Sequence, residues 1–92
     1  MWYGKSMVKI WAKTLKDDKI TRDLMFKLFE KFDKEKFMEY LVEICYDLDI
    51  PTPVLLKTHI NHFDKFNIVR FKTGDFVESI DFDILVLENA SD

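Results

Sequence analysis

The sequence predicts a single α+β domain, in which a three-stranded antiparallel sheet carries two helices packed on one face. The chain has 92 residues, of which 48% are hydrophobic and 34% are charged, so it can bury one core but not two. Apolar and polar residues alternate near both ends of the chain, as half-buried strands require. Between these ends the apolar residues recur at helical spacing, and the expected order is therefore strand, strand, helix, helix, strand.

The first strand is expected over residues 8–15, where Val8, Ile10 and Ala12 fall on one face. Residues 16–19 form a polar run that is typical of a hairpin turn. The segment that follows, up to about residue 27, fits either a second strand or one face of a helix. The tight turn before it favours a strand, but the helical alternative stays open for residues 20–32.

A helix is expected over residues 34–47, with Asp33 as its N-cap, because a carboxylate there can accept the free amides of the first turn. Its apolar stripe consists of Phe37, Met38, Leu41, Ile44, Cys45 and Leu48. Pro51 and Pro53 disfavour helical geometry in the residues before them, so the chain leaves the helix there. A second, shorter helix is expected from Thr58. Its inward residues would be Ile60, Phe63 and Phe66.

The last strand is expected over residues 80–87, after a turn at residues 73–75. Its inner face would hold Ile80, Phe82, Ile84 and Val86. Asp81 and Asp83 would then begin the outer face, which continues with Leu85 and Leu87. Two leucines on a solvent-facing side predict partial cover there by another element or a partner.

The charge of the chain is divided unevenly along its length. Residues 1–36 hold ten bases and six acids, whereas residues 37–92 hold four bases and eleven acids, and the net charge is −3. If the last strand pairs with the first, Lys9 and Lys13 would lie beside Asp81 and Asp83. Opposite charges across a sheet stabilise it by about 0.2–1 kcal/mol per pair. The two halves of the chain would then neutralise each other within the fold.

Cysteine usage and hydropathy favour a cytoplasmic protein with no membrane segment. The single Cys45 cannot form an internal disulfide, and a small secreted domain usually needs several. No apolar run approaches the roughly 20 residues of a membrane helix. Residues 1–6 lack the apolar stretch of a signal peptide and are expected to be a disordered or tag-derived extension. The domain would then cover residues 7–88.

Three segments of the chain resemble a group of small uncharacterised proteins from Gram-positive anaerobic bacteria. They are the opening Lys9-Ile10-Trp11-Ala12-Lys13, the helical Glu43-Ile44-Cys45-Tyr46 and the closing residues 75–83. The resemblance covers roughly Met7 to Glu88. It implies a bacterial origin, and it implies no activity and no site residues.

The chain shows little that points to an enzyme or a cofactor. With two glycines it has few places where the backbone could approach a nucleotide, and it contains no Walker loop, dinucleotide fingerprint or nucleophile elbow. Asp81 and Asp83, with Glu78, could form a carboxylate cluster. A paired-carboxylate hydrolase, however, needs two groups that face each other across a cleft, and neighbours on one strand do not. We therefore expect a non-catalytic protein without a cofactor.

His59 and His62 are three residues apart, so on a helix they would share one side, with Asp64 nearby. Two imidazoles at this spacing can bind zinc, but a zinc site needs three or four ligands. Only half of such a ligand set is visible here. The simpler interpretation is two helix histidines that cap or pack.

Lys9, Trp11 and Lys13 place base, aromatic ring and base along one strand face. Sheet surfaces of this kind hold single-stranded nucleic acid by stacking and charge. Against this, the chain is acidic overall, and a phosphate backbone would be repelled by nearby aspartates. The acids from Asp75 onward could alternatively mimic nucleic acid and inhibit an enzyme that acts on it.

The leading hypothesis is a protein-interaction or regulatory module that binds a protein partner or a second copy of itself. An exposed patch of large apolar residues with a charged rim marks such an interface. The expected patch is Trp11, Leu85 and Leu87, and the expected rim is Lys9, Lys13, Asp81 and Asp83.

Overall fold

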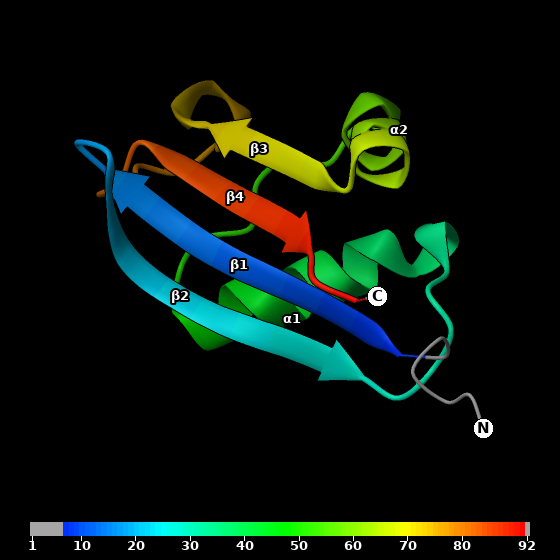
Figure 1. The fold of residues 1–92 in the computed structure, drawn as a ribbon. Coiled ribbons are helices and arrows are strands. Elements are labelled where there is room, and N and C mark those ends of the chain that lie inside the picture. Colours follow the sequence, from blue (N-terminus) through cyan, green and yellow to red (C-terminus); the bar gives the residue numbers. More distant parts are fainter. Residues whose placement is uncertain (1–6, 92) are drawn as a thin grey trace.

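The computed structural model describes residues 7–91 and confirms the α+β class, with a four-stranded antiparallel sheet and two helices. The strands are β1 (Val8–Lys16), β2 (Lys19–Leu28), β3 (Ile68–Lys72) and β4 (Ile84–Asn89), and the helices are α1 (Phe37–Leu48) and α2 (Lys57–Phe66). In the sheet the strands follow the order β2-β1-β4-β3. Figure 1 shows α1 crossing behind the sheet and α2 beside the start of β3. The extension expected over residues 1–6 lies outside the described residues.

The β1–β2 hairpin is present as expected, and the segment after the turn is a strand rather than a helix. Asp17 and Asp18 at its tip have φ angles of 53° and 65°, the left-handed pair of a type I′ turn. Asp and Asn adopt this conformation more easily than most residues, which is why the polar run turns here. A register shift after Thr14 places Ile20 opposite Leu15, on the other face from Phe26.

The prediction of three strands is wrong, because β3 forms a fourth strand at the edge of the sheet. It begins immediately after Asn67, whose left-handed φ of 63° ends α2. Val69 and Phe71 face the core, whereas Arg70 and Lys72 are exposed. Five residues give only two inward positions, too few to stand out as an alternating pattern in the sequence.

The strand expected over residues 80–87 begins later, at Ile84, and runs to Asn89. Residues 76–83 form no regular strand, yet they close one end of the core. Phe76 and Phe82 pack edge to face with ring centroids 5.5 Å apart, and Phe82 is 3% exposed. Phe82 is therefore buried by the packing of this segment and not by a place on the strand.

Helix α1 follows the prediction closely. Asp33 accepts a hydrogen bond from the Glu35 amide over 2.9 Å and caps a short 3₁₀ turn (Lys34–Lys36) that leads into the helix. The helix ends at Asp49, which takes the left-handed conformation that commonly terminates helices. Met38 was expected in the buried stripe, but it is 48% exposed because it lies beside the stripe and not within it.

The core lies between the sheet and the two helices and is dominated by aromatic rings. The rings of Phe37 and Phe63 are 5.1 Å apart and join α1 to α2, and Tyr40 packs on Phe26 of β2. Phe66 was expected to face inward but is 56% exposed. In the part of the chain that the structure describes, no helix is long and apolar enough to cross a membrane.

Candidate functional site

The face of the sheet that points away from the helices has a distinctive chemistry. Because side chains alternate along a strand, the registers of the four strands fix which residues lie on this face. We call the following set the sheet surface: Lys9, Trp11, Lys13, Leu15, Asp23, Met25, Lys27, Ile68, Arg70, Lys72, Ile84, Val86 and Glu88. Five of these residues are basic and two are acidic, although the whole chain carries a net charge of −3.

The centre of the sheet surface is a row of linked side chains. The Trp11 indole N–H donates to Asp23 over 3.0 Å, and the Lys13 ammonium lies 3.8 Å from the centroid of the Trp11 ring. Lys13 also donates to Glu88 over 2.7 Å. Both acids of the surface are therefore engaged, and they hold the tryptophan and one lysine in place.

The other four bases of the sheet surface are Lys9, Lys27, Arg70 and Lys72. None of them makes an ion pair with another residue in the range 7–91. Lys9 and Lys27 lie directly opposite each other on β1 and β2, and like charges in this arrangement destabilise a sheet. Arg70 and Lys72 lie on the edge strand at the other side. The surface thus has a centre in which Trp11 is linked to charged neighbours, and cations without an ion pair among residues 7–91 lie at two of its corners.

Leu85 and Leu87 do not belong to this surface, and their prediction as outer-face residues is wrong. They pair with Thr14 and Ala12, on the helix-covered face, and both are 0% exposed. Val86 takes the outer position between Lys13 and Arg70. From the sequence, the inner and outer faces of β4 were assigned the wrong way round, because apolar residues occupy both faces of this strand.

Asp81 and Asp83 do not form a rim beside Lys9 and Lys13, because both precede the start of β4. The Asp83 carboxylate accepts from the Asp17 amide over 2.9 Å, at the tip of the β1–β2 hairpin. Asp81 lies 3.4 Å from the Arg22 guanidinium. Both acids therefore link the β1–β2 hairpin to the segment that precedes β4. Lys13 pairs with Glu88 instead.

Ten of the thirteen members of the sheet surface were missed from the sequence: Leu15, Asp23, Met25, Lys27, Ile68, Arg70, Lys72, Ile84, Val86 and Glu88. Three of them lie on β3, which was not predicted as a strand. A signal for Val86 was present, since Glu88 is two residues further along and shares its face. A charged residue at the end of an apolar strand marks the face that solvent reaches.

The two histidines have structural partners on separate elements. His59 Nδ1 accepts from the Leu56 amide over 3.0 Å and so caps the first turn of α2, and its ring packs at a tilt against Phe71. His62 Nδ1 lies 2.8 Å from the Ile68 carbonyl. No group of three potential metal ligands is assembled anywhere within residues 7–91.

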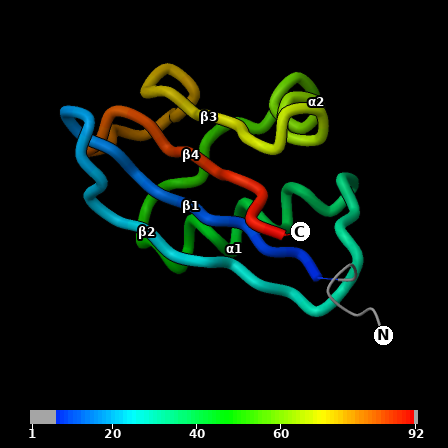
Figure 2. Tube along the Cα trace, viewed as in Figure 1, coloured from blue at the N-terminus to red at the C-terminus, as the bar shows by residue number. Residues whose placement is uncertain are grey.

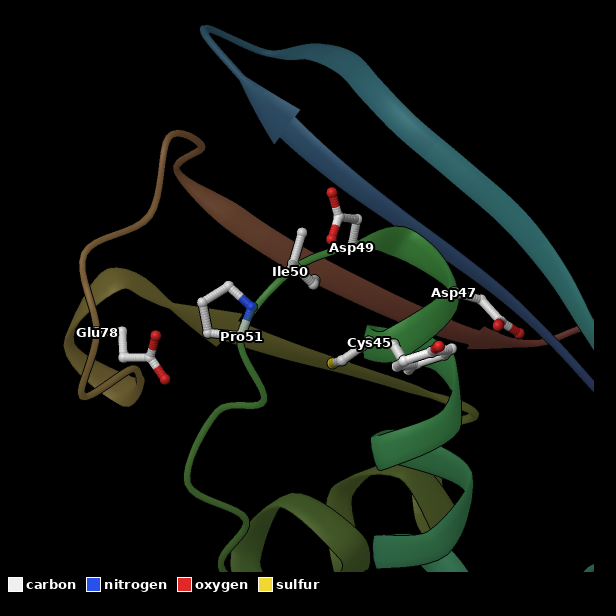
Figure 3. Close-up of a pocket in the computed structure, with 7 residues that line it drawn as sticks. Cys45, Asp47, Asp49, Ile50, Pro51 and Glu78 are labelled. Carbon is white, nitrogen blue, oxygen red and sulfur yellow. The ribbon is translucent and has the colours of Figure 1, made fainter.

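The hollow at the end of α1 is lined by Cys45, two aspartates, Pro51 and Glu78 (Figure 3). Figure 3 shows that the carboxylates of Asp47, Asp49 and Glu78 point in different directions and do not converge. Two carboxylates that share one reaction must face a common space. The hollow therefore lacks the geometry of an acid–base site.

Burial raises the pKa of the Cys45 thiol to about 11, although a hydrogen bond with Thr52 offsets part of the effect. Relative to an ordinary thiol of pKa 9.0, about 100-fold less thiolate is then present at pH 8. We expect iodoacetamide to label the native protein at pH 8 at least 100-fold more slowly than the protein in 6 M guanidinium chloride. Equal rates in the two conditions would contradict the buried position of this thiol.

Comparison of the chain with protein-family models, with curated proteins and with solved structures yields no match.

Proposed function

We propose that the chain is a non-catalytic protein-binding module, and that the sheet surface binds an acidic, partly apolar segment of a partner protein. The observation that carries this proposal is a set of four cations that make no ion pair within residues 7–91 and that lie around Trp11 and Met25. Interfaces place aromatic and other large apolar residues in the middle and charged residues at the rim. Trp11 and Met25, with Met25 42% exposed, occupy the middle here.

The Lys9–Lys27 pair gives the proposal its energetic basis. Two like charges directly opposite each other cost the folded chain up to about 1 kcal/mol. An acidic partner reverses the sign of this contribution, because each carboxylate that arrives is attracted by both lysines. Charge complementarity of this kind raises the rate of association and excludes basic partners.

The test uses Lys9→Glu, because this substitution replaces a repulsive pair by an attractive one. We expect the variant to be more stable than the wild type by up to about 1 kcal/mol in urea unfolding. We also expect it to lose its partner in an affinity pull-down from a lysate of the source cells, treated with nuclease. A gain in stability together with a loss of binding cannot be explained by unfolding.

Lys57→Glu is the matched control, since it makes the same change of charge at an exposed lysine of α2, away from the sheet. It should recover the same partners as the wild type. Partners that bind wild type and Lys9→Glu equally would contradict the role of the sheet surface.

Single-stranded nucleic acid is the second candidate, favoured by the same cations and by Trp11. Its difficulty is that Lys13 already occupies one side of the Trp11 ring and the indole N–H is bonded to Asp23. Four phosphate contacts would give a slope of about −3 in a plot of log affinity against log salt concentration. Polarisation of a labelled oligonucleotide with this slope, and pull-down partners lost on nuclease treatment, would favour this candidate instead.

A further inference from the structure

A second unusual surface lies on α1, on the side of the molecule opposite the sheet surface. Met38, Val42 and Tyr46 are 48%, 45% and 82% exposed, and their spacing of four residues puts them in one line along the helix. Glu39, Glu43 and Asp47 each follow one residue later and form a parallel line of carboxylates. We call these six residues the helix surface. Five of them line a shallow hollow of about 430 Å³.

The helix surface is acidic, although Lys36, three residues before Glu39, is close enough for its charge to interact with that carboxylate. Helix α1 contains no lysine or arginine. In the part of the chain that the structure describes, the carboxylates of Glu39, Glu43 and Asp47 make no ion pair. A row of exposed apolar side chains beside a row of carboxylates is complementary to a surface that is both basic and apolar.

The same chain carries that counterpart in its sheet surface. Because α1 crosses behind the sheet, the two surfaces point in opposite directions and cannot meet within one molecule (Figures 1 and 2). Two sheet surfaces would repel each other through their cations, and two helix surfaces through their carboxylates. A symmetric dimer through either surface is therefore disfavoured.

We propose that the helix surface of one copy docks on the sheet surface of a second copy, an inference that rests on the sheet surface of the proposed function. The dimensions agree, because Glu39 to Asp47 spans about 12 Å along a helix. On the sheet surface, the distance along the strands from the Lys9–Lys27 pair to the cross-strand row that contains Arg70 is about 14 Å. A helix would then cover each face of the sheet, an arrangement that α/β proteins use widely.

This contact joins two different surfaces, so each copy in a pair keeps one surface free. Such heterologous contacts continue into rings or open chains of molecules and do not stop at two. Because the attraction is between exposed charges, it weakens as salt screens them. The association is thus expected to grow with protein concentration and to decline between about 20 mM and 500 mM salt.

The test is sedimentation velocity with two variants that each lack one surface. Lys9→Gln/Arg70→Gln removes two cations of the sheet surface, and Val42→Lys places a cation in the centre of the helix surface. Wild type should exceed the mass of a dimer at high concentration and low salt, whereas each variant alone should associate at least tenfold more weakly. An equimolar mixture of the two should form pairs and stop there, because only one intact surface of each kind remains.

Lys57→Gln/Lys65→Gln, which neutralises two exposed lysines of α2, is the matched control and should associate like the wild type. A wild type that stays monomeric at 20 mM salt, or a mixture that forms no pairs, would overturn this inference. If Lys9→Glu nevertheless loses its pull-down partner, the proposed function stands without it. If the mixture pairs but the pull-down is indifferent to Lys9→Glu, the proposed function fails and self-association remains.

Discussion

Replacing Phe37 by alanine is expected to destabilise the protein by about 3–5 kcal/mol. The Phe37 side chain is 0% exposed, and its ring lies 5.1 Å from Phe63 and 6.3 Å from Tyr40. It therefore joins α1 to α2 at the centre of the aromatic core, and its loss leaves a cavity that the two helices cannot close. A domain of this size has a total stability of about 5–15 kcal/mol, so the variant should lose much of it. Urea unfolding followed by circular dichroism measures the difference.

Phe29→Ala provides the matched control for this prediction. The same atoms are removed, but Phe29 is 88% exposed, so the free energy of unfolding should change by less than about 0.5 kcal/mol. Similar losses in the two variants would mean that the aromatic core is not where the structure places it.

Most of the fold could be predicted from local signals that agree with one another. In β1, Val8, Ile10 and Ala12 alternate with charged or exposed neighbours, and all three are buried as expected. The α1 stripe could be read because Phe37, Leu41 and Ile44 recur at helical spacing, and each is fully buried. Where one face is apolar and the other polar, the pattern defines both the element and its orientation.

The wrong predictions concern segments whose local hydrophobic pattern is compatible with two orientations of the strand. Residues 84–87 are all apolar, so alternation cannot decide which of the two faces is inside. Only tertiary pairing decides: Leu87 lies opposite Ala12 and Leu85 opposite Thr14, on the face that the helices cover. Because of the same ambiguity, Leu85 and Leu87 were assigned to the outer face of the sheet, where Val86 lies instead.

The placement of Lys9, Trp11 and Lys13 on one open face of β1 was predicted correctly. The part of the sheet surface on β3 was not predicted, because five residues carry too little pattern to be recognised alone. The opposition of Lys9 and Lys27 depends on the register of the β1–β2 hairpin, which the register shift near Thr14 alters. Residues far apart in the sequence form this surface, and only the pairing of four strands brings them together.

The orientation of β4 leads to a second prediction with a large effect. Leu87→Glu would bury a carboxylate at a site with 0% exposure beside Ala12 and Val69, where it has no partner. An unpaired buried charge costs several kcal/mol, so we expect the variant to be unfolded or to expose its core at pH 7. Near-ultraviolet circular dichroism and binding of a hydrophobic dye would show the loss of packing.

Val86→Glu is the matched control, one residue away and on the opposite face. Val86 is 6% exposed, but the new carboxylate would lie between Lys13 and Arg70 across the two neighbouring strands, and Arg70, which makes no ion pair within residues 7–91, can pair with it. We expect this variant to stay folded, with a free energy of unfolding within about 1.5 kcal/mol of the wild type. If Val86→Glu unfolds the protein and Leu87→Glu does not, β4 has the opposite orientation. Leu85 and Leu87 would then lie on the open face beside Trp11, and the sheet surface would be far more apolar than the one described here.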